Sequence, residues 1–98
     1  MYKPFTPFTA GTKQISATGT TGNVALAMDS TYLEVSNDGP DTVFVELGGS
    51  TVTAAANTGY PVLPGQSKLI MRSSATYAAA ICASGKTATV YFSAGDGV

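Results

Sequence analysis

Apolar and polar residues alternate along most of this 98-residue chain, the pattern of strands that bury one face. The alternation predicts strands at 14–17, 23–28, 32–36, 42–47, 67–72, 77–82 and 87–93, with 51–55 as a candidate eighth. Turns rich in Gly, Asn, Asp and Pro separate them about every 8–12 residues. This spacing predicts an all-β fold, a single small β-sandwich or jelly roll of seven to eight short antiparallel strands.

The same alternation assigns residues to the core. The side chains expected to point inward are Val24, Leu26, Met28, Leu33, Val35, Val43, Val45, Leu47, Leu69, Met71, Ala88, Val90 and Phe92. In the strand at 67–72 this leaves Lys68 and Arg72 facing solvent. In the loop at 57–65, Val62 and Leu63 are expected to close the edge of the sandwich.

Residues 1–12 differ from the rest because two prolines alternate with aromatic residues. Proline fixes φ and restricts its predecessor to extended conformations, so this stretch is predicted to be an extended arm attached to a β-sandwich domain at 13–98. The aromatic side chains either cap the chain's own core or dock on a neighbouring subunit. The candidate partner interface of the arm is Tyr2, Pro4, Phe5, Pro7 and Phe8.

Charged residues make up only 11% of the chain, against about 25% in typical soluble domains. Threonine and serine, 14 and 9 residues, supply the polar surface instead. A surface of hydroxyl groups suits a protein that packs against other protein. The net charge of −1 and the scattered basic residues argue against nucleic acid as a partner.

Membrane insertion and disulfide bonding are also disfavoured. The longest uncharged stretch with apolar character, 73–85, is too short and too rich in Ser and Ala to span a bilayer. Cys82 is the single cysteine, so the fold does not depend on an oxidising compartment. The N-terminus has no apolar segment of the kind found in signal peptides, which favours synthesis in a cytoplasm.

The sequence contains few of the residue combinations that catalytic sites use. The chain has no histidine, and Cys82 without a basic partner is interpreted as a buried, inert thiol. Glu34 and Glu46 lie on strands that could be neighbours, as in a glycosidase carboxylate pair, but no aromatic sugar platform beyond Tyr32 and Phe44 accompanies them. We expect no enzyme activity and no catalytic residue.

Two further patterns resemble ligand-binding motifs, but we interpret both as turns. Asp38 and Asp41 could share a Ca²⁺ ion, but Asp at turns mostly bonds to backbone. The sequence at 85–87, Gly-Lys-Thr, resembles the end of a phosphate-binding loop, yet Ala80 stands where that loop needs its first glycine, and a strand follows. No cofactor and no metal site are predicted.

Three segments in order carry a family resemblance. They are VSNDGPDTVFVELG at 35–48, PVLPGQS at 61–67, and SGKTATVYF at 84–92 followed by GDG at 95–97. Together they resemble small virion structural proteins of tailed double-stranded DNA bacteriophages. In that family a strand ending in an Asn-x-Gly turn leads to a VxVxLG strand, a P-x-x-P-G loop and a closing Gly-rich strand. The resemblance extends over residues 33–97, so it does not include the arm.

The resemblance implies a non-enzymatic structural part of a phage particle. Within that class it favours a capsid decoration or cement protein that binds across capsid subunit junctions. Its implied partner is the major capsid protein, its implied oligomer is a homotrimer, and its implied location is the virion, assembled in the host cytoplasm. Two alternatives stay open. One is a receptor- or glycan-binding module of a tail, fibre or spike, with Tyr60 and Tyr77 as exposed aromatics. The other is a head-completion or tail structural protein.

Overall fold

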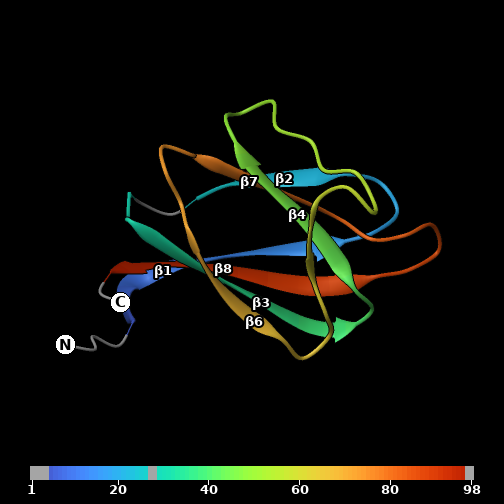
Figure 1. Ribbon diagram of the computed structural model, residues 1–98, viewed down its shortest axis with the longest axis horizontal. Coiled ribbons are helices and arrows are strands. Elements are labelled where there is room, and N and C mark those ends of the chain that lie inside the picture. The colour runs from blue at the N-terminus through green and yellow to red at the C-terminus, as the bar shows by residue number, and fades with distance from the viewer. Residues whose placement is uncertain (1–4, 27–28, 97–98) are drawn as a thin grey trace.

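The alternating segments form eight strands in the computed structural model, which describes residues 5–26 and 29–96. They are β1 (Thr6–Ala17), β2 (Gly22–Ala25), β3 (Tyr32–Pro40), β4 (Val43–Gly48), β5 (Tyr60–Val62), β6 (Ser67–Met71), β7 (Tyr77–Ile81) and β8 (Ala88–Asp96). Two antiparallel four-stranded sheets stack face to face, as Figure 1 shows. The first sheet has the order β1-β8-β3-β6 and the second β2-β7-β4-β5. The predicted all-β sandwich is confirmed.

The strand order is that of a jelly roll. β1 pairs with β8, β2 with β7, β3 with β6 and β4 with β5, as in one long hairpin whose tip lies between β4 and β5. Wrapping this hairpin around itself brings β8 beside β3 and β7 beside β4. The chain therefore closes two Greek-key layers around one core.

The core lies between the sheets and consists of alternating residues from both. Phe92, Leu33, Val35, Val43, Val45, Val62 and Val90 are fully buried. On β7 the inward residues are small, with Ala78 and Ala80 fully buried, so the second sheet packs closely on the first there. The inward faces predicted for β3, β4 and β8 are confirmed, except that Leu47 is only partly buried.

The face predicted for β6 is wrong. Leu69 and Met71 are 39% and 64% exposed, whereas Ile70 between them packs against the core. The three apolar residues are consecutive, so alternation alone does not distinguish the two faces. Pairing with β3 decides it, because Ile70 lies opposite the inward-facing Leu33. Lys68 is consequently only partly exposed.

Arg72 and Leu63 also differ from expectation. Arg72 was expected in solvent but is 3% exposed. Its Nε donates to the Ala75 carbonyl at 2.9 Å and its Nη1 to the Ser30 hydroxyl at 3.0 Å, which satisfies the buried guanidinium. Val62 does close the sandwich edge, but Leu63 is 52% exposed because it leaves the strand on the opposite side.

The strands extend further toward both termini than predicted. β1 begins at Thr6, so the expected boundary after residue 12 falls inside a strand, and β8 continues to Asp96, beyond the predicted end at 93. These ends pair with each other, Thr6 with Asp96 and Pro7 with Gly95. Residues 51–55, the candidate eighth strand, lie in the loop between β4 and β5. The expected inward residue Met28 lies outside the described residues.

A buried amide joins three segments at the end of β3. Asn37 is 2% exposed, and its Nδ2 donates to the carbonyls of Asp41 and Val62, both at 2.8 Å. Its Oδ1 accepts from the Gly39 N–H at 2.7 Å. One side chain thus fixes the β3–β4 turn to the end of β5, where the sequence predicted only a turn residue.

We predict that Asn37→Ala destabilises the fold by about 2–4 kcal/mol, because buried carbonyl and amide groups lose their partners. Asn23→Ala is the matched control. Asn23 is exposed and its amide bonds, at 3.2 and 3.3 Å, lie in solvent, so its loss should cost about 1 kcal/mol or less. Urea denaturation measures both, and equal effects would contradict the role assigned to Asn37.

Candidate interaction surface

The outer face of the first sheet carries an almost uncharged array, here called the hydroxyl face. Its residues are Thr12, Gln14 and Ser16 of β1, Thr89, Tyr91 and Ser93 of β8, Tyr32, Glu34 and Ser36 of β3, and Ser67, Leu69 and Met71 of β6. Strand register aligns them in rows, one of which is Thr12, Ser93, Glu34 and Leu69. All are at least partly exposed, and Glu34 is the one charged residue among them.

Hydroxyl groups on this face bond to one another across the strands. Thr12 Oγ1 lies 2.9 Å from Ser93 Oγ, and Ser36 Oγ lies 3.0 Å from Ser67 Oγ. Hydroxyl groups paired within the sheet keep a partner when water leaves, so covering them costs less than covering charges. The exposed Leu69 and Met71 add apolar area at the β6 border. The face is therefore suited to contact with protein.

The outer face of the second sheet differs because the loop at 49–59 folds over it. Asn23 Nδ2 on β2 donates to the carbonyls of Ser50 and Val52, and the Ala54 N–H donates to Thr21 Oγ1 at 2.9 Å. Ala79, whose position in β7 alternates with the inward-facing Ala78 and Ala80, is nonetheless fully buried. The chain therefore covers the part of this face around Ala79, whereas Glu46 on β4 stays exposed.

The arm aromatics contact the chain's own domain at two places. Phe8 packs against the core cluster. The ring of Phe5 lies so close to Gly95 that a Cβ there would collide with it and with the Thr6 carbonyl, which requires glycine at this position. Pro7 pairs with Gly95 at the start of β1.

This arrangement favours the core-capping role that the sequence left open for the aromatics of the arm. Phe5, Pro7 and Phe8 are brought together near the β1–β8 end, whereas Tyr2 and Pro4 lie outside the described residues. Between the paired Pro7 and Thr12, residues 8–11 bulge opposite Ala94, which lets Phe8 reach the core. Contact between the arm and a partner remains a prediction.

We predict that Phe8→Ala lowers stability by about 1–3 kcal/mol, because a partly buried ring is lost from the core end. Phe5→Ala should cost less, because the Phe5 ring lies against Gly95 and Phe5 is not among the residues packed on the core cluster. Thermal unfolding of both variants measures the difference. A Phe8→Ala protein that melts as the wild type does would reject the capping role.

The two carboxylates considered for catalysis are not brought together. Glu34 lies on the hydroxyl face, whereas Glu46 is exposed on the outer face of the second sheet, so the expectation of neighbouring strands is wrong. Asp41 Oδ2 accepts from the Thr87 N–H at 3.0 Å, and Asp38 is exposed. Across 5–26 and 29–96, no group of three or more His, Cys, Asp or Glu side chains could hold a metal ion.

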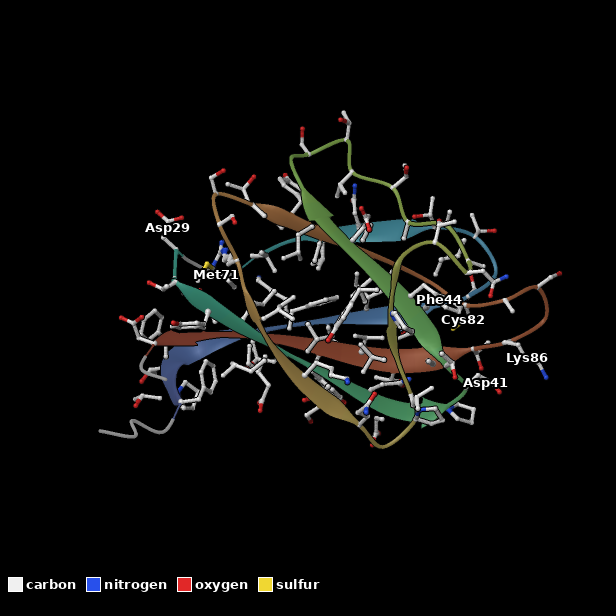
Figure 2. The ribbon with its side chains drawn as sticks, viewed as in Figure 1. Asp29, Asp41, Phe44, Met71, Cys82 and Lys86 are labelled. Carbon is white, nitrogen blue, oxygen red and sulfur yellow. The ribbon has the colours of Figure 1, made fainter. Side chains whose placement is uncertain are left out.

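The remaining candidates are turn and loop features. Gly85 has φ +79° and the Lys86 N–H donates to the Ala83 carbonyl at 3.0 Å, so the β-turn interpretation is confirmed. Figure 2 shows Lys86 on this hairpin, at the end of the molecule away from Asp29 and Met71. Tyr60 is 43% exposed on β5 and Tyr77 is half-buried on β7, with β4 between them, so they do not form one aromatic site.

An open depression of about 420 Å³ lies where the end of β4 meets the β6–β7 turn. It is lined by residues 47–49 and 71–75. Its one charged lining residue is Arg72, whose bonds to Ser30 and Ala75 hold the β6–β7 turn against the start of β3. The arginine therefore has a structural role here.

Cys82 follows β7 and is 1% exposed. Burial raises the pKa of its thiol, and the negative charge of Asp41 raises it further. Figure 2 shows Cys82 and Asp41 in the same half of the molecule. A thiol with a raised pKa stays protonated at neutral pH, which supports the inert role predicted from the sequence.

We predict that Cys82 makes the protein less stable at alkaline pH. An unfolded thiol ionises near pH 9.0, whereas the folded thiol keeps its proton to higher pH. Above pH 9 the unfolded state therefore binds fewer protons, and stability falls as pH rises. Denaturation from pH 7 to 11 should show this loss in the wild type and a smaller one in Cys82→Ala. An equal loss of stability with pH in the two proteins would contradict this prediction.

Searches against protein-family models, curated proteins and solved structures found no match to this chain. In the part of the chain that the structure describes, no helix is long and apolar enough to cross a membrane.

Proposed function

We propose that this protein is a non-enzymatic structural component of a tailed-phage particle, a decoration or cement protein that binds across junctions between capsid subunits. The observation that carries the proposal is the hydroxyl face. Its twelve residues include one charged residue, four of its hydroxyl groups pair within the sheet, and exposed apolar side chains lie at one border.

Such a face suits adhesion without chemistry. Binding must offset the cost of removing water from polar groups, and that cost is highest for charges. Glu34 is the one carboxylate among the twelve residues of the hydroxyl face, which keeps this cost low, although Asp38 further along β3 is also exposed. Weak contacts then add up, because each contact becomes intramolecular once one subunit of an oligomer has bound a repeating surface.

The fold is compatible with the proposal. Jelly rolls serve in viral capsid and lectin domains among others, so the topology alone does not select a function. The family resemblance at 35–48, 61–67, 84–92 and 95–97 supports a virion role among these uses. The major capsid protein is the proposed partner.

We predict that Tyr91→Glu abolishes binding to heads purified from a phage mutant that lacks this protein. Tyr91 lies mid-strand on β8, and a charge there would have to lose water on binding. The matched control is Ile81→Glu, which places the same charge on a half-buried residue of the opposite outer face. Occupancy is measured by gel densitometry of sedimented heads, after both variants are shown to melt above the binding temperature.

The control should bind as the wild type does. Failure of the wild-type protein to bind heads would overturn the proposed function, and density on the tail in electron cryomicroscopy of intact particles would replace it with a tail role. Equal loss in both variants would show that the hydroxyl face is not the contact surface.

A further inference from the structure

The four sheet edges differ in how they are protected from pairing with other strands. β1 carries Pro7 and a bulge at 8–11. β2 has four residues, and the 49–59 loop is bonded beside it. β5 has three residues and contains Pro61. Proline, bulges, short strands and covering loops are the devices by which proteins block edge pairing.

Within the described residues β6 has no proline, bulge or covering loop, and its one protective feature is Lys68, a charged residue on an edge strand. Its five residues pair with β3 in unbroken register, contain no proline, and end in the exposed Leu69 and Met71. Among the strands of the described residues β6 pairs with β3 alone. An unblocked edge with exposed apolar side chains is a surface for pairing with another strand.

The hydrogen bonds beyond both ends of β6 show which backbone groups lie on its free side. The Arg72 N–H donates to the Thr31 carbonyl, and the Gln66 carbonyl accepts from the Asn37 N–H, both at 3.0 Å. Backbone groups alternate in direction along an antiparallel strand, so Lys68 and Ile70 also face β3. The N–H and C=O groups of Ser67, Leu69 and Met71 therefore point away from the sheet.

We propose that β6 pairs with β6 of a second copy of this chain, antiparallel and centred on Leu69. In this register Leu69 exchanges both backbone hydrogen bonds with its equivalent, and Ser67 exchanges both with Met71 of the second copy. Each free backbone group of these residues gains a partner, and the two four-stranded sheets become one continuous sheet.

The side chains of β6 complement each other in this register. Directly opposite residues share a face, so the two Leu69 side chains meet on the outer face and cover each other's apolar area. Lys68, the one charged residue of the strand, lies opposite Ile70 rather than a second Lys68, so like charges are not brought together. This self-complementarity selects a second copy over an unrelated strand.

The pairing is tested in solution on the full chain, with no phage head present, so its outcome is separate from that of the proposed function. Sedimentation velocity up to millimolar concentration should show twice the 9.9 kDa subunit mass. Amide hydrogen exchange should show Ser67, Leu69 and Met71 protected only at concentrations where the dimer forms. Lys68 and Ile70 should stay protected on dilution because they bond to β3.

Leu69→Pro removes only an N–H that points away from β3, so it should preserve the fold and abolish the dimer. Leu69→Lys should do the same by placing two charges opposite each other. Gln14→Lys, the same charge on the β1 edge of the hydroxyl face, should dimerise as the wild type does. Protected Lys68 and Ile70 amides verify that each variant is folded.

Three outcomes with the wild-type protein overturn the pairing. They are a monomer at the highest concentration, a trimeric mass such as the family resemblance implies, and a dimer in which the amides of Ser67, Leu69 and Met71 exchange as they do in the monomer. A folded Leu69→Pro variant that still dimerises also overturns it. If the variants become monomeric and heads still bind the wild type, both proposals stand.

Discussion

The pairing of β8 with β1 on one side and β3 on the other is the interaction on which the rest of the structure depends. It joins the two ends of the chain, closes the wrapped hairpin, and places Phe92 and Val90 at the centre of the core. The same register also sets the rows of the hydroxyl face, because Tyr91 and Ser93 of β8 each lie between partners on β1 and β3. Core and surface are thus fixed by one set of backbone bonds.

The sequence predicts the fold class because most strands alternate cleanly and most turns carry Gly, Asn, Asp or Pro. It fails on β6, where Leu69, Ile70 and Met71 are consecutive and only the partner strand decides which of them faces inward. It fails on Arg72 for a related reason. A charge is buried when bonds from segments distant in the chain satisfy it, and Ser30 is such a distant partner.

The candidate surface was less accessible to sequence reasoning than the fold. Glu34 and Glu46 were expected to be close because their strands are adjacent in sequence, but this jelly roll places β3 and β4 in opposite sheets. Conversely, Thr12 and Ser93 meet although 81 positions separate them. The prolines predict an extended arm, yet the pairing of its residues Thr6 and Pro7 with the last residues of β8 depends on strand order, which alternation does not reveal.

The two proposals are geometrically related. A two-fold axis through paired β6 strands stands perpendicular to the sheet, so both hydroxyl faces point to the same side. Edge pairing would therefore double the area that one assembly presents to a repeating surface, with the exposed Leu69 side chains covered at its centre. The sheet without a covering loop is also the sheet with the unblocked edge. Both features leave the same half of the molecule available for contact, whereas the chain's own loop covers part of the second sheet.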